Sequence, residues 1–119
     1  MTNRRQRIGR WGEDLAAGYL QQHGYTILER NARTPYGEID LVTRQGEILI
    51  FLEVKTRTNR SFGMPEDAVN PRKQSHMLAA AEHYAGLKGA ENWQVDVISI
   101  EGRPGREADI VHFENVLGG

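Results

Sequence analysis

The fold is decided by one stretch of eight residues, Ile48-Leu49-Ile50-Phe51-Leu52-Glu53-Val54-Lys55. Its first five residues are branched or aromatic hydrophobes, a composition typical of a strand buried on both faces. Glu53 and Lys55 are two positions apart, so both side chains project from the same face of that strand. A charge at the end of a buried strand is costly unless it is paired or binds something. The stretch therefore predicts a central strand that ends in a candidate functional site.

Length and composition set broad limits on the class of protein. The 119 residues predict a single domain, 1–119, with a sizeable core. No apolar run reaches the roughly 18 residues of a membrane span, and the arginine-rich N-terminus lacks the apolar segment of a signal peptide. The absence of cysteine excludes disulfides and thiolate chemistry. It favours a cytoplasmic location.

The charges are unevenly distributed along the chain. Residues 1–73 contain 12 Lys or Arg against 9 Asp or Glu, which is +3, and residues 74–119 contain 3 against 7, which is −4. A basic surface around an acidic centre suits a ligand with a phosphate backbone. The same charges are equally typical of an ordinary solvated surface, so both interpretations remain open.

The periodicity predicts the element order α-β-β-β-α-β-β and thus an α/β fold. The expected helices span 5–23 and 71–87, and the expected strands span 26–30, 38–44, 47–57, 93–100 and 108–113. Gly24 supplies a C-terminal stop for the first helix, and Pro71 is favourable at the first position of the second.

The strands 38–44 and 47–57 are predicted to form a hairpin through Gln45-Gly46. With an even-numbered loop centred there, Asp40 lies opposite Phe51 and shares one face with Glu53 as a diagonal neighbour. An odd-numbered loop would place Asp40 and Glu53 on opposite faces. The candidate site thus depends on the parity of this loop.

Two carboxylates that share a face need a proton or a cation between them. At about 5 Å they repel by roughly 3 kcal/mol at an effective dielectric constant near 20. Oxygen ligands without cysteine or paired histidines favour Mg²⁺ or Mn²⁺ over zinc. The four histidines have no paired spacing and are interpreted as caps or surface groups: His23, His76, His83 and His112.

The spacing of these residues resembles a known motif. Asp40, followed after twelve intervening residues by Glu53-Val54-Lys55, resembles the motif of the PD-(D/E)XK nuclease fold. The wider pattern is similar to the uncharacterised bacterial YraN-like family over essentially the whole chain. The segments that carry this resemblance are Gly9-Arg10-Trp11-Gly12-Glu13, Gly37-Glu38-Ile39-Asp40-Leu41-Val42, Phe51-Leu52-Glu53-Val54-Lys55-Thr56-Arg57, Ala68-Val69 and Lys73.

The resemblance implies a Holliday-junction-resolvase-like or tRNA-endonuclease-like fold. Such a fold has a three-layer, restriction-endonuclease-like core with a mixed central sheet flanked by helices. One departure is that Glu38-Ile39-Asp40 lacks the proline that names the motif, so only Asp40 is carried over from this segment.

The resemblance also implies roles for individual residues. Asp40 and Glu53 would bind the metal, with the Val54 carbonyl as a third ligand. Lys55 would position or deprotonate the attacking water or stabilise the oxyanion. Glu13 resembles the acid on the first helix of resolvase-like enzymes, although a helix carboxylate that faces solvent is an equal alternative.

Several basic or polar residues near these positions are candidates for phosphate contacts, although each alone is more typical of a solvated side chain. They are Arg57, Arg60, Arg72, Lys73 and Gln74. Lys73 and Gln74 are the better candidates because the resembled fold brings the second helix near the site.

The expected function is that of a Mg²⁺- or Mn²⁺-dependent endonuclease. It would act on nucleic acid, on DNA ahead of RNA and with branched DNA among the substrates. A non-catalytic nucleic-acid-binding module and a dimeric assembly protein are the alternatives, and a homodimer remains open. The joint presence of Asp40, Glu53 and Lys55 favours catalysis, because binding alone does not need these acids.

Overall fold

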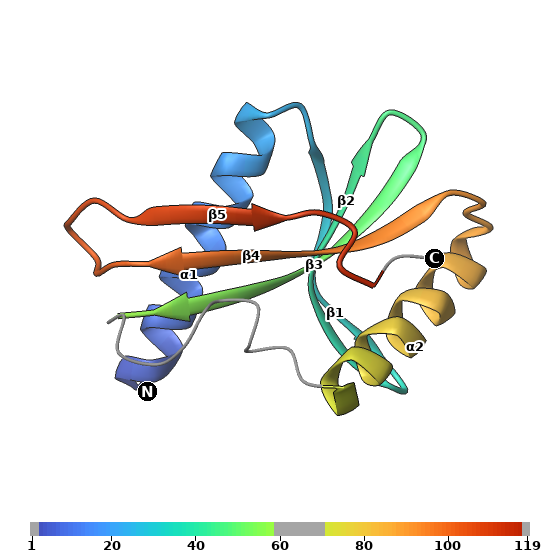
Figure 1. Cartoon of the computed structure of the whole chain (residues 1–119), viewed down its shortest axis with the longest axis horizontal. Helices are drawn as coiled ribbons and strands as arrows, with labels where there is room; N and C mark the ends of the chain where they lie inside the picture. Colours follow the sequence, from blue (N-terminus) through green and yellow to red (C-terminus); the bar gives the residue numbers. More distant parts are fainter. Residues whose placement is uncertain (1–2, 59–70, 118–119) are drawn as a thin grey trace.

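The computed structural model describes residues 3–58 and 71–117. Its elements are α1 Arg4–Gln22, β1 Thr26–Thr34, β2 Gly37–Gln45, β3 Ile48–Arg57, α2 Pro71–Lys88, β4 Trp93–Glu101 and β5 Asp109–Phe113 (Figure 1). The predicted order α-β-β-β-α-β-β is confirmed. The first strand was predicted to end at residue 30 but continues to Thr34, because its pairing with β2 extends to Thr34 and Gly37 on either side of a tight turn.

All five strands belong to one sheet in the order β1-β2-β3-β4-β5. The pair β3–β4 is parallel, and the other neighbours are antiparallel. The predicted mixed sheet is therefore confirmed, with β3 at its centre. This position explains the apolar run at the start of β3, because a central strand is covered on both faces.

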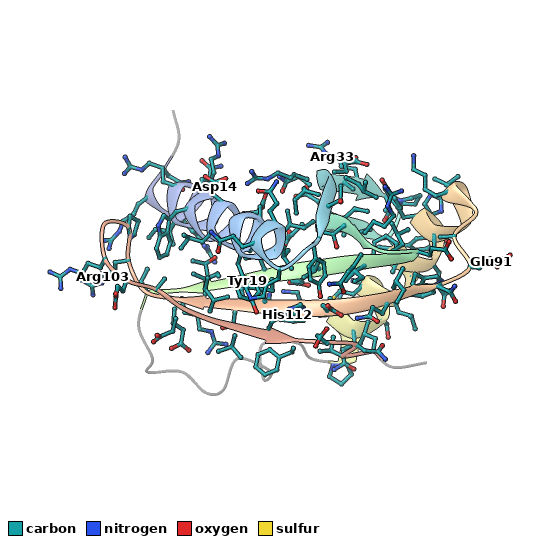
Figure 2. The ribbon with its side chains drawn as sticks, turned by 90° about the horizontal axis from the view of Figure 1, so that it is seen from above. Asp14, Tyr19, Arg33, Glu91, Arg103 and His112 are labelled. Atoms are coloured by element: carbon teal, nitrogen blue, oxygen red, sulfur yellow. The ribbon has the colours of Figure 1, made fainter. Side chains whose placement is uncertain are left out.

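The two helices cover opposite faces of the sheet and complete a three-layer arrangement. Helix α1 packs Ala16 and Leu20 against residues such as Leu52 and Ile98, as its position along one face in Figure 2 shows. Helix α2 packs on the other face through a cluster that includes Ala81, Tyr84, Phe51 and Val95. Neither of these helices, within the described residues, is long and apolar enough to cross a membrane.

Helix α1 approaches β3 closely at Gly12. A Cβ atom at this position would lie 2.8 Å from Thr56 Cγ2 and 2.9 Å from Thr56 Cβ. Because Thr56 is β-branched and fixed on a strand, it cannot move away easily. Gly12 is therefore required by packing.

The substitution Gly12→Ala is expected to destabilise the fold by about 1–3 kcal/mol through overpacking, despite the better helix propensity of alanine. Gly18→Ala is the matched control, because no atom lies within 4 Å of a Cβ there. It should stabilise the helix by roughly 0.5–1 kcal/mol. Urea unfolding of both variants checks the prediction, and equal effects would contradict the close approach.

The β2–β3 hairpin has an even-numbered loop, the parity on which the candidate site depends, but its turn is centred one residue later than assumed. Gln45 pairs with Ile48, so the loop is Gly46-Glu47, and Phe51 lies opposite Val42 instead of Asp40. The physical reason is the turn itself. Gly46 has φ +61°, and two-residue hairpin loops favour glycine at a first position with positive φ.

The corrected register brings the two acids closer together. The pairing of β2 with β3 ends at Leu41 and Leu52, so Asp40 and Glu53 follow at the next position of each strand. The two acids are close enough for the charge of Glu53 to raise the pKa of Asp40.

The strands β1 and β2 keep one register on both sides of Asp40, and their register shift lies between Ile27 and Glu29. Their register pairs Arg30 with Leu41 and Ala32 with Ile39, which places Asn31 beside Asp40. Asn31 has φ +54°, a conformation that asparagine adopts more readily than most residues. Beyond this point β2 no longer alternates regularly, because Ile39 lies in the α2-facing cluster and Leu41 in the α1-facing cluster. The alternation of side chains between the two faces of the sheet is therefore broken at Asp40.

Candidate active site

The Asp40 side chain takes the place of a backbone partner at the end of the β2–β3 ladder. Its Oδ2 accepts a hydrogen bond of 2.8 Å from the Val54 backbone N–H. The N–H and C=O of one strand residue project from the same edge of the strand. The Val54 carbonyl therefore projects toward the same edge as Asp40.

Asp40 lies in an environment that opposes its charge. The pKa of its carboxyl is raised to about 6, mainly by burial and also by the neighbouring carboxylates of Glu53, Glu13 and Glu38. The hydrogen bond from Val54 acts in the opposite direction and lowers it. A cation beside Asp40 would remove the repulsion between these acids.

Glu53 is held by two lysines. Its Oε1 lies 2.8 Å from Lys55 Nζ and 2.5 Å from Lys73 Nζ. Lys55 comes from the same strand face, whereas Lys73 comes from the first turns of α2. Helix α2 therefore adds a second lysine to the one that β3 itself places beside Glu53.

The two lysines differ in their electrostatics. Burial lowers the pKa of Lys55, and the neighbouring Lys73 contributes to the same shift. Burial also opposes the charge of Lys73, but the interactions with Glu53, Lys55 and Asp40 together outweigh it and raise the pKa of Lys73. Lys55 is therefore the lysine that loses its proton more readily, and Lys73 is the more permanent cation.

A cavity of about 200 Å³ lies over this cluster on the α2 side of the sheet. Asp40, Glu53 and Lys73 line its polar part. Its apolar part includes Phe51 and Met77. The acids and Lys73 therefore face a common space that is large enough for a small group.

A second cavity of about 1150 Å³ reaches Asp40 from the α1 side. Glu13 lines it and is fixed there by Arg30 Nε at 3.1 Å and Asn31 Nδ2 at 3.0 Å. Only 14% of the Glu13 side chain is exposed, which favours the site interpretation of this acid over the solvent-facing alternative. The exposed arginines of this cavity are Arg5, Arg10, Arg30 and Arg33.

The oxygen atoms around Asp40 are suitable ligands for a hard divalent cation. Among the described residues, no hydrogen-bond partner is seen for Asp40 Oδ1 or Glu53 Oε2. These two oxygens, together with the Val54 carbonyl, form an all-oxygen set of the kind that Mg²⁺ prefers. Their residues would hold the ion between β2 and β3.

The remaining predicted residues are placed less centrally. Arg57 ends β3 and lines neither cavity, and Gln74 is exposed on α2 and also lines neither. Arg60 lies outside the described residues. Sequence reasoning missed Arg30 and Asn31, which fix Glu13. The one signal for Asn31 is the tolerance of asparagine for positive φ.

The fold and the site define an α/β protein with a five-stranded mixed sheet between two helices and an acid–lysine cluster at the β2–β3 hairpin. Residues 12–100 match the family described as Uncharacterised protein family UPF0102. The chain belongs to this family, the YraN-like proteins.

Curated relatives from several bacteria carry the same family name. A UPF0102 protein of Syntrophotalea carbinolica is 49% identical over 95% of this chain and 93% of its own length. One from Dehalococcoides mccartyi is 38% identical over 99% and 98% of the two chains. One from Syntrophomonas wolfei is 46% identical over 92% and 96%.

One solved structure is similar at a much greater distance. Pyrococcus furiosus SfsA, solved in complex with Ca²⁺, is 14% identical with a TM-score of 0.49. The similarity covers 89% of this chain and 63% of the other. A resemblance this distant does not bear on function.

Proposed function

We propose that this protein is a Mg²⁺-dependent endonuclease that hydrolyses phosphodiester bonds in nucleic acid, with DNA, including branched DNA, as the expected substrate. The observation that carries the proposal is that Asp40 and Glu53 line one cavity, close enough for their charges to interact, with Lys55 and Lys73 paired to Glu53. A binding surface has no need for neighbouring acids in a part-buried position, because they repel each other and the phosphates.

The roles of the residues follow from their protonation. A bound Mg²⁺ would supply charge neutralisation at the phosphate and a more acidic water. Lys55, whose pKa burial lowers, orients the attacking water and accepts its proton. Lys73 remains charged and stabilises the negative charge that develops on the phosphate oxygens. Asp40 and Glu53 hold the ion, and Glu13 maintains the acidic field beside Asp40.

The substrate backbone would enter from the α1 side. Arg5, Arg10 and Arg33 are exposed at the larger cavity, whereas Glu13 and Asp40 lie deeper. Arginines at the rim suit non-specific phosphate contacts, which position a nucleic acid without reading its sequence. The larger cavity is therefore the expected path of the backbone toward Asp40.

A cleavage panel tests the proposal. Linear, nicked and four-way-junction DNA are incubated with the wild-type protein in Mg²⁺ and in EDTA, beside the variant Glu53→Gln. We expect Mg²⁺-dependent cleavage that falls by about 100-fold or more in the variant, because a metal ligand is lost. Glu47→Gln is the matched control, since Glu47 is exposed in the turn of the same hairpin, and it should retain wild-type activity.

The outcomes separate the proposal from its alternatives. Cleavage that survives Glu53→Gln would contradict the proposed centre. Binding without cleavage on all substrates would instead favour the non-catalytic module, for which the two lysines on Glu53 are a specific argument because they already neutralise that acid. A homodimer remains a prediction that a mass measurement in solution tests.

A further inference from the structure

A second cluster of ionisable residues lies on the opposite face of the sheet from Glu53. Asp96, His112 and Glu114 each offer a ligand atom, and these atoms lie within 4.8 Å of one another. Asp96 pairs with Leu52 of the α1-facing core, whereas Glu53 pairs with Val97. The cluster is therefore separate from the candidate active site.

The histidine of this cluster is not a surface group, as the sequence had suggested. Only 10% of the His112 side chain is exposed, and its Nε2 lies 2.7 Å from Asp96 Oδ2. Its ring contacts Tyr25 and Tyr19, which points toward it in Figure 2. These contacts leave the ring little freedom to reorient.

The two carboxylates are also held in place by neighbours. Asp96 is completely buried, and its Oδ1 accepts hydrogen bonds from Gln94 Nε2 at 2.9 Å and from the Asn115 backbone N–H at 2.8 Å. Glu114 lies close enough to the Tyr25 hydroxyl for its charge to raise the pKa of Tyr25, after burial as the main cause. Partners that orient the ligands in this way are characteristic of metal sites.

The charges of the cluster do not balance. Two carboxylates face one imidazole, so the net charge is −1 even when His112 is protonated. Among the described residues, His112 is the one cationic group bonded to Asp96. A buried carboxylate beside a second acid is costly without more positive charge. A divalent cation supplies that charge.

The spacing of the atoms also suits one ion. Ligand atoms about 2.0–2.1 Å from a tetrahedral ion lie roughly 3.3 Å apart. The 2.7 Å hydrogen bond between His112 and Asp96 therefore needs to open only slightly to admit an ion. One imidazole nitrogen with two carboxylates suits a first-row transition ion such as Zn²⁺ better than Mg²⁺.

We propose that Asp96, His112 and Glu114 form a structural binding site for a divalent transition ion, with Zn²⁺ as the probe. The ion would fasten the segment after β5 to β4. This segment already contacts β4 through Asn115 and through the Val116 N–H, which donates to the Val95 carbonyl at 2.8 Å. The ion replaces the proton between His112 and Asp96 and neutralises both acids.

The test is calorimetric titration of metal-free protein with Zn²⁺, with Co²⁺ absorption as a second readout. We expect the wild type to bind a single ion and to melt at a higher temperature in its presence. His112→Gln should weaken binding by about 100-fold or more, and Glu114→Gln by about 10–100-fold. The second variant guards against misfolding, because Glu114 is exposed.

Two controls make the result specific to this site. His83→Gln changes a half-buried histidine on α2, which packs on the other face of the sheet, and should leave Zn²⁺ binding unchanged. Asp40→Asn should also leave it unchanged while it removes Mg²⁺ binding, so failure of the endonuclease proposal and of this one are distinguishable. The proposal is overturned if the wild type takes up no Zn²⁺, or if the wild type, His112→Gln and Glu114→Gln bind it equally.

Discussion

Replacing Asp40 with asparagine is expected to stabilise the folded chain by about 2–3 kcal/mol at pH 7, and to abolish Mg²⁺ binding and cleavage at the candidate active site. The pKa of Asp40 rises from 3.8 to about 6 on folding. A difference of roughly 2 pK units corresponds to about 3 kcal/mol between the two protonation states. Asparagine removes the charge and still offers an oxygen to the Val54 N–H.

The pH dependence follows from the direction of the shift. A carboxyl whose folded pKa is raised binds its proton more tightly in the folded state. Wild-type stability is therefore lost as the pH rises from about 4 to about 6, and it stays lower above that range. The advantage of Asp40→Asn should be full at pH 7 and absent below about pH 4.

Urea unfolding at pH 7 and at pH 3.5 measures both effects. Asp14→Asn is the matched control, because Asp14 forms an exposed ion pair with Arg30 that contributes little. That variant should not be stabilised at either pH. A less stable Asp40→Asn at pH 7, or an advantage that persists at pH 3.5, would show that the burial of the charge is not costly. The expected gain in stability with loss of function is common at active sites.

Replacing Phe51 with alanine is expected to destabilise the fold by about 3–5 kcal/mol. Phe51 is 2% exposed at the centre of β3. Its ring meets Tyr84 and Trp93 edge to face, at centroid distances of 5.6 Å and 6.0 Å. Alanine would leave a cavity between the sheet and α2 that these rings cannot fill.

Ile48→Ala is the control in the same strand, because Ile48 is 40% exposed. Its cost should stay below about 1.5 kcal/mol, since less apolar area is lost. Urea unfolding of the two variants gives the comparison. If Phe51→Ala is largely unfolded, Phe51→Leu should show a smaller loss in the same direction. Equal costs for Phe51→Ala and Ile48→Ala would contradict the central position of Phe51.

Local sequence patterns predicted the fold well, because the same apolar periodicity and turn residues that define a pattern also stabilise the element it predicts. An apolar run such as 48–52 is stable only when both faces are covered, so it had to become a central strand. The hairpin itself was predicted, but the parity of its loop was left open, and the structure shows the even-numbered case. The centre of the turn was missed by one residue, because the preference of Gly46 for the first turn position outweighed the symmetric placement.

The candidate site was less predictable, because its contacts join distant parts of the chain. Lys73 reaches Glu53 from α2, and Arg30 reaches Glu13 from β1. No local spacing encodes either pair. The cluster around His112 was missed for the same reason, since Asp96 and His112 meet through the pairing of β4 with β5.

The sequence by itself determined the order of the elements, the central strand and a hairpin that carries Asp40 on one strand and Glu53 on the other. These features depend on periodicity and turn chemistry, which act between near neighbours. Only the tertiary structure decided how deeply Asp40 is buried, which lysines hold Glu53 and where a second cluster of acids meets a histidine. Burial and charge pairing depend on which surfaces pack together, and the packing of α1 and α2 on opposite faces of the sheet is a property of the whole chain.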